Sequence, residues 1–350
     1  MLLYIHIPFC ASKCGYCGFN SLTNMLDFKE KYLQSLILDL KNSLLLRKKQ
    51  KISSVYIGGG TPNMLNPSDY ECILKALQGH LKNDAEITIE LNPNTSQICT
   101  LREFRDLGIN RFSIGVQSFD KQKLQLLERI HSPKIARTFI ENAIKCDVNV
   151  SIDLIYDTIL DSKDLLFCEL ETAIKLDVGH ISCYTISLDK HSTFFSKNKY
   201  IMRENSLCYE LKNVLESHHF TQYEVSNFAK THKSKHNLGY WAYSDYIGVG
   251  LGAVGKITDK DSIYRTYKQG DFNAYISNPN AINYEILSEN DIVLEKIFLG
   301  LRSEVGVESQ LITNKERLKI LLENDKIYQK NSRIFAKNYF LADEMALFLS

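Results

Sequence analysis

The strongest constraint on the fold is the regular alternation of short apolar runs and helical patterns between residues 2 and 186. The runs that we interpret as strands are 2–7, 54–59, 86–91, 111–116, 150–156 and 180–186. Strands that alternate with helices at this interval form βαβ units around a parallel sheet. Six units are too few to close an eight-stranded barrel, so we predict an α/β fold with a partial (β/α)6 barrel.

The pattern changes after about residue 220. Residues 236–256 are rich in glycine and tyrosine, and we expect an irregular loop followed by a short strand. From residue 289 onward the sequence is polar and has helical periodicity. We therefore divide the chain into a barrel over 1–225 and a smaller, mainly helical C-terminal region over 226–350.

Charge and hydropathy argue against several classes of protein. The net charge of +1 does not suggest a strongly basic nucleic-acid-binding protein, and no apolar run reaches the roughly 18 residues of a membrane span. The first residues lack the cationic start and the long apolar segment of a signal peptide. The nine cysteines are odd in number and mostly scattered, so we expect a cytoplasmic protein without a disulfide framework.

Three of these cysteines, Cys10, Cys14 and Cys17, lie within eight residues just after the first predicted strand. A structural zinc ion is one alternative, but zinc usually takes four protein ligands and no second cysteine pair accompanies these three. Thiolates also ligate iron–sulfur clusters. Three of them on an open loop can hold three irons of a [4Fe–4S] cluster and leave the fourth iron for the methionine end of S-adenosylmethionine (SAM). This spacing therefore indicates radical SAM chemistry.

Other polar residues and glycines occur at or soon after the ends of predicted strands. They are Gly59, Gly60, Thr61, Glu90 and Gln117, and they are joined by Asp153 inside the fifth predicted strand and by Arg129 further along the chain. The carboxyl ends of parallel strands meet at one edge of a sheet, where the sites of such proteins lie. Glycines let the backbone approach a ligand, carboxylates and amides can bond ribose hydroxyls, and an arginine can clamp a carboxylate. Each residue taken alone fits a turn, a cap or a surface position equally well.

Taken together, these motifs resemble the radical SAM family that comprises the oxygen-independent coproporphyrinogen III oxidases and the related haem chaperones. The resemblance covers nearly the whole chain and is carried by YIHIPFC, IGGGTP, ELNPNT, GINRFSIGVQSF, DLIY, YEVSNFAK and HNLGYW. It implies a radical SAM barrel with a [4Fe–4S] cluster on Cys10, Cys14 and Cys17. It also implies that SAM contacts a set of nine residues. They are Tyr4, Phe19, Gly59, Gly60, Thr61, Glu90, Gln117, Arg129 and Asp153.

Two features separate the branches of this family. The oxidases have a further cysteine two residues after the third motif cysteine, where this chain has Phe19. The segment HNLGYW, with His236, Asn237, Tyr240 and Trp241, matches a signature of the haem chaperones. The resemblance thus implies that these four residues bind haem, with His236 as a ligand of the haem iron. Both features favour the chaperone branch.

The chain also departs from the family pattern in two segments. Asp157 and Ile159 stand where the fifth strand is usually followed by glycine and proline, and Glu128 stands where glycine usually precedes the segment RIH. The first change affects the turn near Asp153, and the second affects the placement of Arg129.

The resemblance implies a haem chaperone that carries a [4Fe–4S] cluster, SAM and haem and that inserts haem into respiratory proteins. It implies no coproporphyrinogen oxidase activity, no nucleic-acid partner and at most peripheral contact with a membrane, and it leaves a homodimer open. The first alternative is an oxygen-independent coproporphyrinogen III oxidase, a radical SAM enzyme of porphyrin biosynthesis that oxidatively decarboxylates its substrate. The second alternative is a zinc-binding module.

Overall fold

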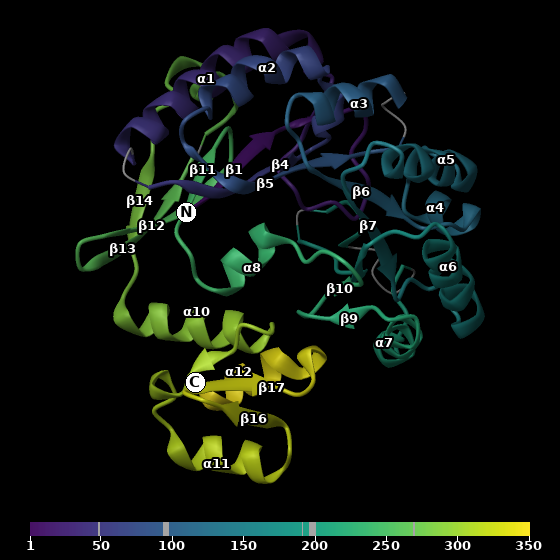
Figure 1. Ribbon diagram of the computed structural model, residues 1–350, viewed down its shortest axis with the longest axis vertical. Coiled ribbons are helices and arrows are strands. Elements are labelled where there is room, and N and C mark those ends of the chain that lie inside the picture. Colours follow the sequence, from purple (N-terminus) through teal and green to yellow (C-terminus); the bar gives the residue numbers. More distant parts are fainter. Residues whose placement is uncertain (48–49, 94–97, 191, 196–200, 269) are drawn as a thin grey trace.

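A large sheet with helices along its outside, and a smaller C-terminal unit beside it, make up the molecule (Figure 1). The computed structural model describes residues 1–47, 50–93, 98–190, 192–195, 201–268 and 270–350. The last two residues of ELNPNT lie outside these ranges. In the described part of the chain, no helix is both long enough and apolar enough to span a bilayer.

Six parallel strands form the centre of the sheet, in the order in which they occur along the chain. They are β1 (Leu2–Ile7), β4 (Ile52–Gly59), β5 (Leu81–Leu91), β6 (Arg111–Gln117), β7 (Asn149–Tyr156) and β8 (His180–Thr185). Helices lie between successive strands of this set and after the last one. They are α1 (Lys29–Leu46), α2 (Pro67–Ala76), α3 (Ile98–Asp106), α4 (Lys121–Leu126), α5 (Pro133–Ile144), α6 (Lys163–Lys175) and α7 (Cys208–Ser217). These positions confirm the predicted partial (β/α)6 barrel.

The main hydrophobic core lies between these strands and helices. Ile5 and Ile7 in β1 are fully buried, as expected for a parallel strand that is covered on both faces. The starts of α4, α5 and α6 are fixed by Asp120, Ser132 and Ser162, whose side chains accept from backbone amides in the first turn. The loops that connect the carboxyl ends of the strands to the starts of these helices therefore lie at one edge of the sheet.

Further strands extend the sheet at both sides. β11 (Tyr246–Val249), β12 (Val254–Asp259), β13 (Ser262–Tyr267) and β14 (Asn283–Ile286) continue it beyond β1, and β10 (Asn227–Ala229) and β9 (Thr221–Gln222) continue it beyond β8. Strands from both sides of the expected division between residues 225 and 226 thus share one sheet. A separate pair, β2 (Phe9–Cys10) and β3 (Leu22–Thr23), lies next to the end of β1.

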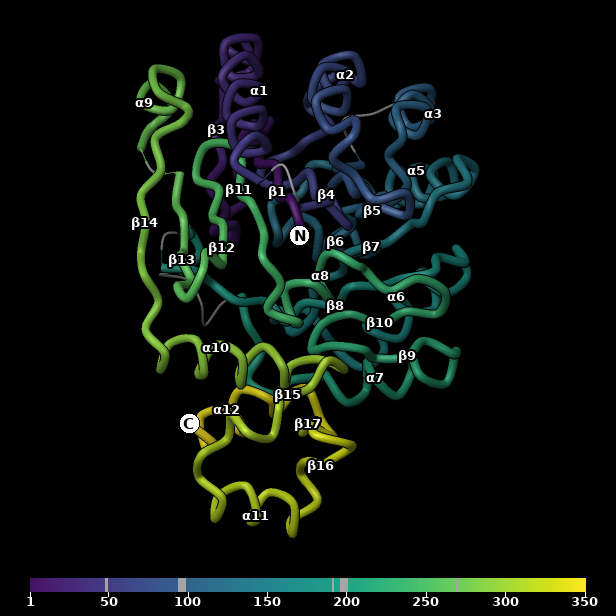
Figure 2. The backbone as a smooth tube through the Cα atoms, turned by 60° about the vertical axis from the view of Figure 1, so that its left-hand side comes forward, coloured from purple at the N-terminus to yellow at the C-terminus, as the bar shows by residue number. Residues whose placement is uncertain are grey.

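The C-terminal unit has a core of its own. It contains α10 (Glu289–Leu301), β15 (Val307–Glu308), α11 (Lys315–Glu323), β16 (Ile327–Lys330), β17 (Arg333–Ala336) and α12 (Ala342–Leu349). Leu301, Ile334 and Ala346 belong to this core, which is separate from that of the barrel. The unit is mainly helical, as predicted, and Figure 2 shows it at the end of the molecule away from α1 and α9 (Phe272–Ser277).

The prediction of an irregular loop at HNLGYW was wrong, because Lys235–Trp241 form helix α8. Ser234 caps this helix by accepting from the amide of Asn237 at 3.3 Å, and the carboxylate of Glu86 on β5 accepts from two further amides at 3.1 Å. Gly239 allows close packing, since a Cβ there would lie 2.6 Å from the side chain of Leu2. Tertiary contacts thus override the weak helical propensity of this segment.

Candidate functional site

The three motif cysteines lie beyond the carboxyl end of β1, with Cys10 at the end of β2 and Cys14 and Cys17 on the loop that follows it. The amide of Cys17 donates to the carbonyl of Cys14 at 3.0 Å, and Cys10 Sγ is 3.5 Å from Thr61 Oγ1. All three thiols are free of disulfides, and the three residues line a first cavity of about 570 Å³. Burial raises the pKa of the Cys17 thiol, so a thiolate there needs a cationic partner such as a metal.

The glycine segment after β4 forms another wall of the first cavity. Gly59 has a φ of +120°, and a Cβ there would lie 2.5 Å from the ring of His6. A Cβ on Gly60 would lie 2.7 Å from the carbonyl oxygen of Pro8. Both positions therefore need glycine, and the bare backbone reaches the cavity.

Two half-buried carboxyl groups face the first cavity from neighbouring parts of the sheet. Glu90 accepts from the hydroxyl of Tyr56 at 2.8 Å and from the amide of Gly59 at 3.1 Å. Asp153 on β7 accepts from the hydroxyl of Ser113 at 3.3 Å. Burial raises the pKa of both groups, that of Glu90 to about 7. Their oxygens can bond ribose hydroxyls in either protonation state.

Gln117 and Arg129 lie on the side of the first cavity formed by β6 and the segment after α4. Gln117 has a φ of +66° at an irregularity between β6 and β7. Arg129 Nη2 donates to the carbonyl of Gly115 at 2.8 Å, and its Nη1 is 3.8 Å from Cys14 Sγ. Its Nε is buried and has no hydrogen-bond partner among the described residues. A guanidinium with a spare donor suits a carboxylate ligand.

Glu128 and Asp157, the two residues that replace glycine, both have a left-handed backbone conformation, which explains why glycine is usual there. Glu128 has a φ of +53° and is exposed, and Asp157 has a φ of +66°. The carboxylate of Asp157 accepts from the hydroxyls of Thr185 at 2.7 Å and Ser206 at 2.6 Å, and from the amide of Leu207 at 2.8 Å. Asp157 therefore stabilises its turn through its side chain, next to the predicted SAM site.

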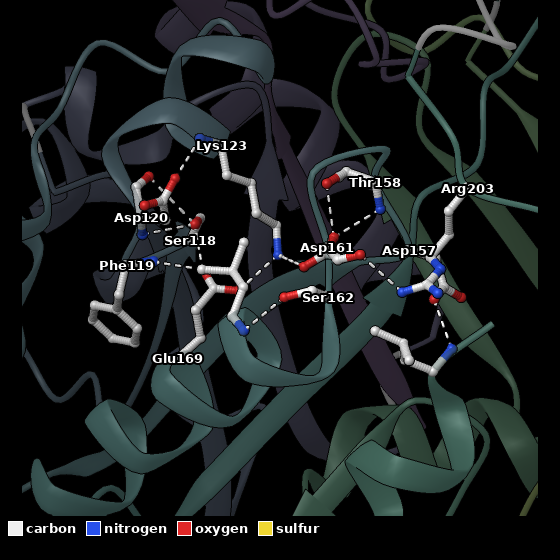
Figure 3. A network of polar contacts seen from close by, with 12 residues as sticks. Ser118, Phe119, Asp120, Lys123, Asp157, Thr158, Asp161, Ser162, Glu169 and Arg203 are labelled. Atoms are coloured by element: carbon white, nitrogen blue, oxygen red, sulfur yellow. Dashed lines mark hydrogen bonds and ion pairs between the residues drawn. The ribbon is translucent and has the colours of Figure 1, made fainter. Parts of the chain in front are cut away.

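A buried ionic network lies next to the loops that follow β6 and β7 (Figure 3). Lys123 Nζ is 2.7 Å from Asp161 Oδ1 and 2.7 Å from Glu169 Oε2, and all three side chains are almost fully buried. Glu169 also accepts from the hydroxyl of Ser118, and Asp161 accepts from the amide of Thr158 at 2.8 Å. The network thereby joins the loops that follow β6 and β7, which carry or adjoin the predicted SAM residues.

A second cavity, of about 930 Å³, lies between β11–β13, α8 and α10. Asn237, Tyr240 and Trp241 of the predicted haem motif line it. Tyr4, which we expected near SAM, lines the second cavity and not the first, whereas Phe19 lines both. The structure therefore gathers the predicted residues, except His236, around two adjacent cavities.

Residues without a recognisable motif complete both cavities. The first cavity includes Tyr184, and the second includes the basic residues Lys256, Arg265 and Arg302. Each of these three bases is ion-paired with a carboxylate. No local sequence pattern marks these residues, because only the fold brings their strands and helices together.

His236 does not line the second cavity. Its side chain is 1% exposed, and its ring lies 5.2 Å from that of Tyr56 and 4.6 Å from that of Tyr240, between centroids. Nδ1 shares a hydrogen bond of 2.9 Å with Ser54 Oγ, and Nε2 is buried without a partner in the described part of the chain. Burial lowers the pKa of the imidazole to about 3, so it is neutral. Iron ligation would require α8 to move away from β4.

The groups around the first cavity suit a [4Fe–4S] cluster and SAM. Within the described ranges, no three His, Cys, Asp or Glu side chains are placed to hold a single metal ion. The three cysteines instead share a cavity with Arg129, Glu90 and Asp153. Thiolates suit the irons of a cluster, and Arg129 with its spare donor suits the carboxylate of SAM.

Comparison with known proteins connects this arrangement to one family. The model of the radical SAM superfamily matches residues 4–160. The haem chaperone HemW of Buchnera aphidicola subsp. Schizaphis graminum is 36% identical over 302 residues, which cover 84% of this chain and 79% of that protein. HemW of Escherichia coli K12 is 35% identical, covering 76% and 73%, and HemW of Bacillus subtilis is 30% identical, covering 95% and 94%.

The fold has a close counterpart among solved structures. Coproporphyrinogen III oxidase (HemN) from Escherichia coli, a radical SAM enzyme, matches with a TM-score of 0.81 at 21% identity, over 99% of this chain and 89% of that one. This likeness shows the fold, and the radical SAM superfamily implies a [4Fe–4S] cluster and SAM. Since the HemW proteins match most of this chain and are matched over most of their own length, the chain belongs to the HemW family of radical SAM proteins.

Proposed function

We propose that this protein is a haem chaperone that holds a [4Fe–4S] cluster and SAM in the first cavity and haem in the second. The observation that carries the proposal is the second cavity, which Asn237, Tyr240 and Trp241 of the haem-chaperone signature line. The identity to HemW proteins of several bacteria supports the same function.

In the first cavity, Cys10, Cys14 and Cys17 would each ligate one iron of the cluster, which supplies an electron when it is reduced. Arg129 would bind the methionine carboxylate of SAM through its spare donor, and Glu90 would bond ribose hydroxyls. The other SAM contacts are assigned to Phe19, Gly59, Gly60, Thr61, Gln117 and Asp153.

In the second cavity, the side chains match the chemistry of haem, a flat apolar ring with two carboxylates. Tyr240 and Trp241 offer aromatic surface, and the buried Trp241 Nε1 has no hydrogen-bond partner among the described residues. Arg265 and Arg302 offer N–H donors for the propionates, and each is also ion-paired with a carboxylate of this protein. His236 would become an iron ligand only if α8 moved, so the proposal depends on the cavity and not on His236.

The proposed role includes transfer of the bound haem. Side-chain contacts that hold haem without a covalent bond allow its release, and we infer respiratory haem proteins as the acceptors. Transfer would take place in the cytoplasm or at a membrane surface. No nucleic acid takes part in this scheme.

The test is a pair of assays on protein whose cluster has been reconstituted anaerobically. In the first assay haem is titrated and followed by absorbance, and we expect saturable binding. In the second assay the protein is incubated with SAM, a reductant and coproporphyrinogen III, and we expect no protoporphyrinogen. Sustained formation of protoporphyrinogen without haem binding would establish the oxidase alternative instead.

The cluster assignment has its own control within the same experiment. Cys14→Ser should abolish the iron–sulfur absorbance, whereas Cys72→Ser, which changes an exposed cysteine on α2, should leave it unchanged. A Cys14→Ser protein that still holds four irons and four sulfides would show that the assignment is wrong. One equivalent of zinc without sulfide in the unmodified protein would favour the zinc-binding alternative.

A further inference from the structure

The segment Gly18–Phe19 separates the two cavities. Within the described ranges, these are the two residues that line both the first cavity and the second. Phe19 is 70% exposed, so its side chain is open to a ligand. A molecule in one cavity and a molecule in the other would therefore meet at the same residue.

One end of this segment is attached to the cysteine loop. The backbone amide of Phe19 hydrogen-bonds the thiol of Cys17, and the carbonyl of Phe19 accepts from Lys13 Nζ at 3.3 Å. Gly18 lies so close to Asp189 that an added Cβ would be 2.8 Å from the Cβ of that residue. The backbone at Phe19 is thus fixed relative to a predicted cluster ligand.

The other end of the segment is attached to the wall of the second cavity. His6 Nε2 shares a hydrogen bond of 2.8 Å with the carbonyl oxygen of Asn20, and His6 Nδ1 shares one of 2.9 Å with the hydroxyl of Tyr4. Tyr4, His6 and Asn20 all line the second cavity. Hence the backbone is held at both ends, whereas the side chain of Phe19 is exposed at a residue that lines both cavities.

We propose that Phe19 couples the two sites, so that SAM in the first cavity and haem in the second increase each other's affinity. The first ligand to bind would immobilise the exposed Phe19 side chain by packing against it. The second ligand would then bind to a side chain that is already ordered, at a smaller cost in conformational entropy. Thermodynamic linkage requires that both affinities change by the same factor. For a single side chain we expect a factor on the order of fivefold, at the low end of measured couplings. This inference rests on the proposed haem-chaperone function.

The experiment is a thermodynamic cycle on the full-length protein with an oxidised, anaerobically reconstituted cluster. Haem is titrated with and without saturating SAM, and SAM is titrated with and without haem, in the absence of reductant so that SAM stays intact. The unmodified protein should bind haem about fivefold more tightly with SAM present, and SAM about fivefold more tightly with haem present.

Three variants identify the side chain responsible. Phe19→Ala should reduce the coupling factor to about one while the cluster absorbance stays unchanged, and Phe19→Tyr should retain the coupling because it keeps an aromatic ring. Tyr284→Ala is the matched control, since it removes a 63% exposed aromatic residue that lines neither cavity.

The outcomes separate this inference from the proposed function. Haem and SAM that both bind, with affinities independent of each other or mutually weakened, would refute the coupling and leave the chaperone proposal intact. A coupling that survives in Phe19→Ala would refute the role of this side chain. Absence of haem binding in the unmodified protein would refute the proposed function and, with it, the inference.

Discussion

The carboxyl group of Glu90 illustrates how burial sets the properties of single residues in the first cavity. Hydrogen bonds from Tyr56 and Gly59 favour its charged form, yet burial is the larger effect and raises its pKa to about 7. The folded protein therefore retains a proton that the unfolded chain releases from a group with an ordinary pKa of 4.5. This difference makes stability depend on pH.

Glu90→Gln should remove that dependence. Because the folded pKa is the higher one, the contribution of Glu90 to the free energy of unfolding is fully present below pH 4.5 and is lost as pH rises to about 7. The loss corresponds to about 3 kcal/mol. Urea denaturation of the cluster-free protein at pH 5 and pH 8 measures it, with Glu71→Gln at an exposed site as control. The same pH dependence in Glu90→Gln and in the unmodified protein would contradict this account.

The two residues that replace glycine should respond in opposite ways when glycine is restored. Glu128→Gly removes a left-handed non-glycine residue with an exposed side chain and should raise the free energy of unfolding by up to about 1 kcal/mol. Asp157→Gly also relieves the backbone, but it removes three hydrogen bonds, so it should lower stability by about 1–3 kcal/mol. Chemical denaturation of both variants tests this, and equal changes would show that backbone conformation alone decides.

At the scale of helices and strands, the sequence predicted the barrel but not the helix that carries the haem motif. The six runs of apolar residues coincide with β1 and β4–β8 because buried parallel strands leave a continuous local signal. Helix α8 leaves none, since Gly239 and Tyr240 have weak helical propensity. Two of its first amides donate to Glu86, which lies about 150 residues earlier in the chain, and a third donates to the adjacent Ser234. Such a distant cap is invisible in a local pattern.

The network around Lys123 connects two loops, and its removal should affect both stability and SAM binding. Lys123→Met would leave Asp161 and Glu169 buried without their cation, which should cost about 3–5 kcal/mol. Adding Glu169→Gln should restore part of the loss, because one of the unpaired charges is then removed. Denaturation and calorimetric titration with SAM measure both effects. Lys121→Met, at an exposed position of the same helix, is the control, and a Lys123→Met protein that behaves like it would refute this role.

At the scale of the whole molecule, the two cavities arise from parts of the chain that are far apart in sequence. The residues of the first cavity were predictable because they follow successive strands, whose carboxyl ends meet at one edge. The second cavity was not, because it joins Tyr4 on β1, Trp241 on α8 and Arg302 after α10. The buried position of His236 was equally hidden, since HNLGYW gives no indication of which side chains face inward.

The measurement that tests the central claim most directly is the haem affinity of Trp241→Ala. If haem occupies the second cavity, loss of this aromatic contact should weaken binding by about 1–3 kcal/mol, roughly 5- to 150-fold. Cluster absorbance and SAM binding should persist, and Tyr284→Ala should bind haem like the unmodified protein. Unchanged haem affinity and spectrum in Trp241→Ala, and in the double variant with Tyr240→Ala, would place haem outside this cavity and contradict the account.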